Sequence, residues 1–141
     1  MSEKLKRGYK TLLDEAKREI VEIPAADAQR LVGNPDTVIV DLRDPRELEI
    51  EGRIPGSFHC PRGMLEFWID PESPYFKPVF GEGKAYVFHC ASGWRSALAA
   101  KTAQDMGLAR VAHIEGGLKA WKAAGGPIEP YAIKPHEPKK S

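Results

Sequence analysis

Residues 84–96 read KAYVFHCASGWRS and combine the end of a predicted strand, a short loop and the start of a predicted helix. Its first half, Lys84–His89, is a short apolar run typical of a buried strand. Cys90 follows directly at the carboxyl end of that strand. A helix is predicted from Ser96 to Met106, with Gly107 placed as a C-cap glycine. A strand, a short loop and a helix in immediate succession indicate an α/β domain.

The flanking segments continue this alternation. Further strands are predicted at 21–23, 37–40, 57–60 and 111–114, further helices at 5–20, 25–32, 46–51, 63–69 and 118–124, and loop at 70–83. We therefore expect an α/β fold with a central, mostly parallel sheet flanked by helices on both faces. Ligands of such sheets bind beyond the carboxyl ends of the strands, where Asp41 and Cys90 fall.

Length and composition limit the classes of protein. The 141 residues suit one domain, and 42% hydrophobic with 29% charged residues is ordinary globular composition. We expect an amphipathic helical extension at 1–20, the domain at 21–130 and a flexible tail at 131–141. The net charge of +1 offers no excess of basic residues for nucleic acid or an anionic membrane. A monomer is expected from the size alone.

The apolar runs, the N-terminal stretch and the few cysteines and histidines bear on cellular location and metal binding. No apolar run is long enough to span a membrane, and the acid-containing N-terminal stretch lacks the apolar core of a signal peptide. Two cysteines are too few for a disulfide framework, and the four histidines are scattered. The sequence therefore predicts a cytoplasmic protein without a metal site.

The loop after the central strand carries the candidate chemistry. Successive backbone N–H groups in such a loop can converge on one point, and the following helix adds positive potential there. A thiolate at Cys90 would be favoured in that position. Gly93 permits a positive φ, Arg95 adds a cation suited to oxyanions, and Ser96 can cap the helix. These residues together describe an electropositive cradle for an anionic substrate. The alternative is that Cys90 is an ordinary buried apolar residue.

Other residues have two interpretations each. Asp41 would support the active-site loop by pairing with an arginine or with backbone N–H groups, or it is a plain turn residue. Trp94 would line the pocket or lean outward. Cys60 is a buried inert thiol or a resolving thiol for Cys90. His89 should point away from Cys90, since neighbours on a strand face opposite sides, and His113 is interpreted as a packed strand residue.

Three motifs in order carry a family resemblance. Cys90-x-x-Gly93-x-Arg95-Ser96 resembles the active-site loop of rhodanese (thiosulfate sulfurtransferase) domains. Residues 38–43, followed by Glu47 and 52–57, are similar to the first motif of that family. Residues 116–121, GGLKAW, resemble its final Gly-Gly-x-x-x-Trp motif. The resemblance spans about residues 20–130. Arg53 departs from it, because the family usually has histidine there.

The resemblance implies a mechanism. Cys90 would take the outer sulfur of thiosulfate or a small persulfide, forming a persulfide that cyanide or a thiol then accepts. The acceptor could be a thioredoxin-like or sulfur-carrier protein. Arg95 would help bind the anionic donor, and no metal or organic cofactor would be needed. The substrate-binding residues would be Ala91, Ser92, Gly93, Trp94, Arg95 and Ser96.

Two other classes compete with this interpretation. Cysteine phosphatases and arsenate reductases use a similar loop with one more residue between cysteine and arginine, which widens the cradle for a tetrahedral oxyanion. A non-catalytic rhodanese-like module is the other alternative, although such modules often lack the cysteine that this chain retains. The loop also differs from that of mercaptopyruvate sulfurtransferases, so thiosulfate or a persulfide is the expected donor.

Overall fold

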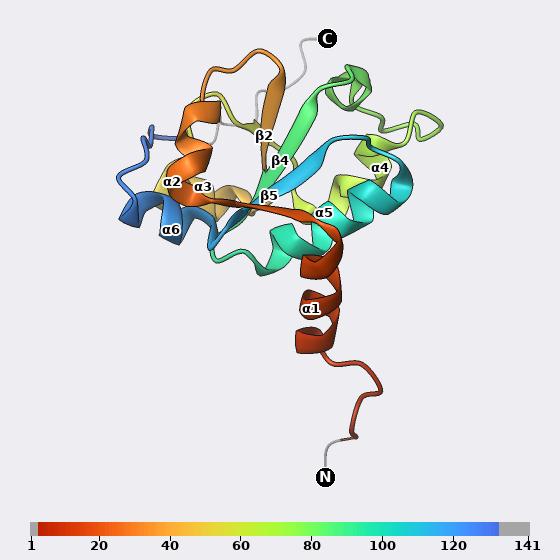
Figure 1. The fold of residues 1–141 in the computed structure, drawn as a ribbon. Coiled ribbons are helices and arrows are strands. Elements are labelled where there is room, and N and C mark those ends of the chain that lie inside the picture. Colours follow the sequence, from red (N-terminus) through yellow and green to blue (C-terminus); the bar gives the residue numbers. More distant parts are fainter. Residues whose placement is uncertain (1–2, 133–141) are drawn as a thin grey trace.

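A five-stranded sheet with all strands parallel forms the centre of the computed structural model, which describes residues 3–132 (Figure 1). The strands are β1 (Val21–Pro24), β2 (Thr37–Asp41), β3 (Phe58–His59), β4 (Ala85–His89) and β5 (Val111–Glu115). Their order across the sheet is β1-β5-β4-β2-β3, so β4 lies in the middle. The predicted α/β class and parallel sheet are confirmed. The tail expected at 131–141 lies, from residue 133 onward, outside the described residues.

Helices lie on both sides of this sheet (Figure 1). They are α1 (Tyr9–Glu19), α2 (Ala25–Ala28), α3 (Pro45–Glu51), α4 (Leu65–Ile69), α5 (Trp94–Met106) and α6 (Gly117–Ala123), with 3₁₀ turns at Gln29–Leu31, Arg62–Met64 and Pro78–Gly81. Within the described range, no helix is long and apolar enough to cross a membrane.

Several helix boundaries differ from the predicted ones. The first helix begins at Tyr9 rather than at residue 5, because Gly8 takes the extended conformation of an N-cap. The helix predicted for 25–32 divides into α2 and a 3₁₀ turn, and another 3₁₀ turn precedes α4. The central helix begins at Trp94, two residues early, because Gly93 adopts the left-handed conformation that turns the chain into it.

The sheet separates two apolar cores. Val40 and Phe88 face one core with Leu65 of α4, whereas Ile39 and Val87 face the other. This alternation follows from the period of two along a strand. The first core also contains residues of α1 and α5, and the second contains residues of α2 and α6. The carboxyl ends of β2 and β4 are consequently held between two packed layers.

Trp68 and Trp121 both lie among apolar residues of predicted helices and are expected in the core, but they differ in burial. Trp121 is fully buried in the second core, and its indole N–H donates to the carbonyl of Pro127 at 2.8 Å. Trp68 is only partly buried and packs at the border of the first core. The interpretation of Trp121 as a core residue is therefore correct, and Trp68 is a peripheral member.

Candidate active site

The thiol of Cys90 lies at the carboxyl end of β4, directly before the first turn of α5. Its sulfur accepts hydrogen bonds from the backbone N–H groups of Gly93, at 3.2 Å, and Ser96, at 3.4 Å. The residue is only 1% exposed. Two donors of one short loop thus converge on the sulfur, which is the arrangement that stabilises negative charge there.

Further N–H groups of the loop are available to a ligand. Within residues 3–132, those of Ser92, Trp94 and Arg95 donate to no protein acceptor. Trp94 and Arg95 open α5, where N–H groups have no partner inside the helix. An anion bound over the sulfur would find these donors together with the positive end of the helix.

The two glycines of the GGLKAW motif let α6 approach the cysteine loop. A Cβ atom on Gly117 would lie 2.5 Å from the carbonyl oxygen of Cys90, closer than real Cβ contacts come. The N–H groups of Leu118 and Lys119 donate to the carbonyls of Cys90 and Ala91, at 2.8 and 3.1 Å. The first turn of α6 thus binds the loop through its carbonyl groups. The N–H groups of the loop remain able to bind the sulfur and its ligands.

Arg95 forms a bidentate ion pair with Glu47 of α3. The two N–O distances are 2.7 and 2.9 Å, and both side chains are partly exposed. The hydrogen bonds from Arg95 lower the pKa of Glu47, and those to Glu47 raise the pKa of Arg95. Glu47 also closes a capping box with Asp44, which orients it at the start of α3. No local pattern in the sequence links Glu47 with Arg95, because α3 and α5 meet only in the folded chain.

Asp41 and Arg43 form an ion pair in which both side chains are buried. The Arg43 Nε and Nη2 atoms lie 3.0 and 2.8 Å from the two carboxylate oxygens, and Nη2 also donates to the carbonyl of Gly52 at 2.8 Å. Burial raises the pKa of Asp41, but the hydrogen bonds and charges of Arg43 and His89 outweigh it, so the net pKa is lowered. Of the two predicted kinds of partner, an arginine or backbone N–H groups, the structure has both: the Arg43 guanidinium, and the Arg43 backbone N–H, which donates to Oδ1 at 3.0 Å.

Ser96 does not cap α5, contrary to the prediction. The N-cap position belongs to Gly93, and Ser96 is the third residue of the helix, fully buried. Its Oγ lies 2.9 Å from Nδ1 of His113 and accepts from the Cys90 thiol at 3.6 Å. His113 is a buried strand residue as expected, but it also contacts Glu22 of β1 at 2.9 Å. No local pattern links these residues, because Glu22 meets His113 through the register of β1 with β5, and Ser96 meets His113 through the packing of α5 on β5.

The remaining candidates form no hydrogen bond with the sulfur among the described residues. Trp94 leans outward, 54% exposed, with its ring 5.0 Å from that of Tyr9 in α1. Cys60 is completely buried, and burial raises its pKa to about 12, which suits an inert thiol. His89 faces Asp41, with Nε2 3.5 Å from the carboxylate. Arg53, which replaces the usual histidine, forms an ion pair with Glu129 at 2.7 Å.

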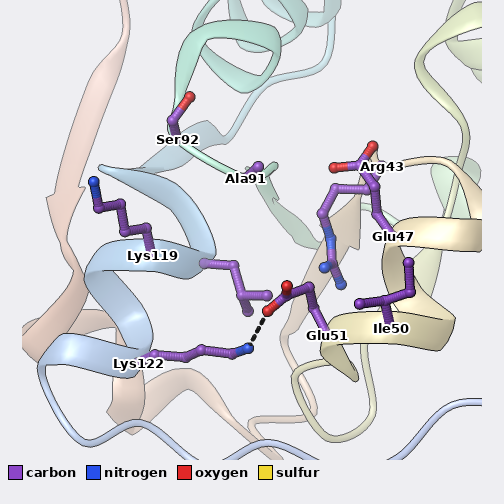
Figure 2. A pocket seen from close by; sticks show the side chains of 9 residues that line it. Arg43, Glu47, Ile50, Glu51, Ala91, Ser92, Lys119 and Lys122 are labelled. Carbon is purple, nitrogen blue, oxygen red and sulfur yellow. Dashed lines mark hydrogen bonds and ion pairs between the residues drawn. The ribbon is translucent and has the colours of Figure 1, made fainter.

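A cleft of about 440 Å³ opens beside the cysteine loop (Figure 2). Ala91 and Ser92 form one edge, and α3 and α6 form the others; the lining residues are Arg43, Glu47, Ile50, Glu51, Ala91, Ser92, Leu118, Lys119 and Lys122. Its volume is typical of a small-molecule site. Among the described residues, no cluster of three or more His, Cys, Asp or Glu side chains could hold a metal ion.

The fold and this loop define a class: an α/β protein with a thiol held by backbone N–H groups at the end of the central parallel strand. The model of the rhodanese-like domain family matches residues 24–124, and the chain belongs to this family.

The chain is similar to several known proteins. The chain is 35% identical over 107 residues to a thiosulfate:glutathione sulfurtransferase of Saccharomyces cerevisiae, covering 71% of this chain and 76% of the relative. Among solved structures, a Rhodopseudomonas palustris protein of unknown function, described as a possible tyrosine phosphatase, is 64% identical with a TM-score of 0.88, covering 92% of this chain and 99% of that one. A polysulfide-sulfur transferase homodimer from Wolinella succinogenes is 31% identical with a TM-score of 0.66, covering 91% of each chain.

Proposed function

We propose that the protein is a sulfurtransferase that moves a sulfane sulfur from thiosulfate or a small persulfide to a thiol or to cyanide. The observation that carries this proposal is the convergence of the Gly93 and Ser96 N–H groups on the Cys90 sulfur. These donors would stabilise the thiolate before the reaction and the persulfide after it. The sulfurtransferase among the sequence relatives and the polysulfide-sulfur transferase among the structures support the same reaction class.

The reaction has two displacements. The Cys90 thiolate attacks the outer sulfur of thiosulfate, a new S–S bond forms, and sulfite leaves with the electron pair of the old bond. The acceptor then attacks the outer persulfide sulfur and releases the Cys90 thiolate. Arg95 and the free N–H groups of the loop bind the anionic donor. Asp41 and Arg43 hold the end of α3, the helix that carries Glu47, the partner of Arg95. Neither displacement requires a metal or an organic cofactor.

The cleft beside the loop is the proposed entrance for donor and acceptor. Its lining has three cationic side chains, Arg43, Lys119 and Lys122, against the carboxylates of Glu47 and Glu51, and Lys122 pairs with Glu51 at 2.6 Å. A small anionic thiol fits this combination of volume and charge. A thioredoxin-like or sulfur-carrier protein is the larger acceptor that the same opening would serve.

Mass spectrometry of the intact protein tests the proposal. After incubation with thiosulfate, we expect the mass to rise by one sulfur atom, mapped to Cys90, and to return to its initial value after cyanide is added. Cys90→Ser should abolish the gain while the fold is retained. Cys60→Ser, which changes the other and completely buried thiol, is the matched control and should still gain the sulfur. Sulfur gain in Cys90→Ser would refute the mechanism.

A cysteine phosphatase is the second candidate, because the Rhodopseudomonas palustris protein is described as a possible tyrosine phosphatase. Only four residues separate Cys90 from Arg95 here, one fewer than in that class. The tighter cradle should crowd a phosphate group, so we expect no hydrolysis of p-nitrophenyl phosphate. Hydrolysis that depends on Cys90, without any persulfide, would favour the phosphatase instead.

A further inference from the structure

A line of hydrogen bonds connects the Cys90 thiol with a carboxylate on the far strand of the sheet. The Cys90 thiol donates to Ser96 Oγ at 3.6 Å, Ser96 Oγ lies 2.9 Å from His113 Nδ1, and His113 Nε2 lies 2.9 Å from Glu22 Oε2. The four residues come from the end of β4, from α5, from β5 and from β1. The Ser96 hydroxyl has two acceptors within reach, the Gly93 carbonyl at 3.3 Å and the nearer His113 Nδ1. When it donates to Nδ1, one set of protons satisfies the whole line: the thiol donates to Ser96, the Ser96 hydroxyl to Nδ1, and Nε2–H to Glu22.

Only the outer end of this line meets water. Cys90, Ser96 and His113 are each at most 1% exposed, whereas the Glu22 side chain is 26% exposed. Glu22 and His113 line a cleft of about 230 Å³ on the β1 side of the loop, separate from the larger cleft on the α3 side. The sulfur is buried and cannot pass its proton directly to water. The side chains of Ser96, His113 and Glu22 connect it to the surface instead.

We propose that Ser96, His113 and Glu22 form a proton relay that converts the Cys90 thiol to the thiolate. The thiol proton passes to Ser96 Oγ while the Ser96 hydroxyl proton passes to His113 Nδ1. Ser96 then donates to the thiolate, and the imidazolium is held by the Glu22 carboxylate. The inference rests on the proposed sulfur transfer, for which it supplies the attacking thiolate. Ser96 touches the reacting sulfur, and His113 and Glu22 are positioning residues.

The resting charge of His113 leaves its ring able to accept a proton. Burial lowers the pKa of His113, and this effect outweighs Glu22, whose hydrogen bond and charge raise it. The other charged groups that act on the ring are Lys17 of α1, which lowers the pKa, and Glu115 of β5, which raises it. The imidazole is therefore neutral at neutral pH, with Nδ1 free to accept the Ser96 proton.

Alkylation of Cys90 by iodoacetamide, followed across pH by mass spectrometry, tests the relay without requiring sulfur transfer. We expect His113→Gln to slow alkylation about tenfold near neutral pH, because the variant has no basic ring nitrogen to accept the Ser96 proton and so forms less of the reactive thiolate. At alkaline pH, where the thiolate forms in either protein, the two rates should converge. A merely structural defect would lower the rate at every pH or abolish the thermal transition.

Two more variants allow the relay to be tested even if His113→Gln does not fold. Glu22→Gln keeps a hydrogen-bonding group at a partly exposed site and should shift the pH profile in the same direction. Glu19→Gln, which removes a nearby exposed carboxylate that pairs with Lys101, is the matched control and should leave the profile unchanged. Unshifted profiles in both folded relay variants would overturn the relay. Failure of wild-type Cys90 to take sulfur would instead refute the proposed function and leave the alkylation result intact.

Discussion

The Asp41–Arg43 pair fixes the end of β2 beside the cysteine loop. Both side chains are almost inaccessible to water, so each charge depends on the other for stabilisation. A buried ion pair adds little net stability compared with an apolar pair, but removal of one partner leaves an uncompensated charge. Arg43 also holds the carbonyl of Gly52, the residue that ends α3. One residue therefore ties the strand end to the helix that carries Glu47.

We expect Asp41→Asn to lower the free energy of unfolding by about 3–5 kcal/mol, because it leaves the Arg43 guanidinium buried without a counter-charge. The lowered pKa of Asp41 means that its contribution is present above the unfolded-state pKa and is lost as pH falls through the folded-state pKa. Denaturant titrations at several acidic pH values should therefore show a weaker pH dependence in the variant. Asp105→Asn, which breaks an exposed pair with Lys101, is the control and should cost less than about 1 kcal/mol. Equal losses in both variants would contradict this account of Asp41.

At the scale of elements, the joint between the cysteine loop and α6 determines where the loop carbonyls point. Gly116 and Gly117 both have positive φ, and Gly117 has no room for a side chain. Gly93 approaches the same turn, since a Cβ there would lie 3.2 Å from the Gly116 nitrogen. The Gly-Gly motif thus belongs to the site itself, although it lies more than twenty residues after the cysteine.

We expect Gly117→Ala to reduce sulfur transfer about a hundredfold, because the added methyl must push the Cys90 carbonyl and displace the loop by a large fraction of an ångström. Steady-state rates with thiosulfate and cyanide measure the loss. Gly125→Ala is the matched control: Gly125 also has positive φ, at 79°, but a Cβ there meets nothing within 4 Å. Similar losses of activity in the two variants would mean that backbone strain, rather than the contact with the loop, is responsible.

The contrast between local and distant contacts explains what the sequence could predict. Periodicity and the placement of Gly and Pro were sufficient for the order of the elements and for the loop of Cys90, Gly93 and Arg95. Helix ends were less accurate, because Gly93 and Gly8 set them through backbone conformation. The pairing of Arg95 with Glu47, and the line from Ser96 to His113 and Glu22, depend on strand register and helix packing. Such contacts leave no periodic signal in one sequence.

At the scale of the molecule, α1 extends the domain beyond its family boundaries. The family match begins at residue 24, yet Leu13, Ala16 and Ile20 are buried, and Leu13 and Ile20 belong to the first core. In Figure 1, α1 lies next to α5, the helix that begins at the cysteine loop. The contact between Tyr9 and Trp94 joins α1 to that loop as well. We infer that α1 is an integral layer of the fold.

This inference predicts different effects for two adjacent leucines of α1. Leu13→Ala should lower the free energy of unfolding by about 2–3 kcal/mol, because Leu13 is 7% exposed and its removal leaves a cavity in the first core. Leu12→Ala, at a position that is 38% exposed, is the matched control and should cost less than about 1 kcal/mol. Urea denaturation followed by circular dichroism measures both. A single transition with a shifted midpoint is expected for Leu13→Ala, because the first core spans α1, α5 and the central strands. Equal midpoints for the two variants, or a separate early transition for α1, would show that the helix is an appendage instead.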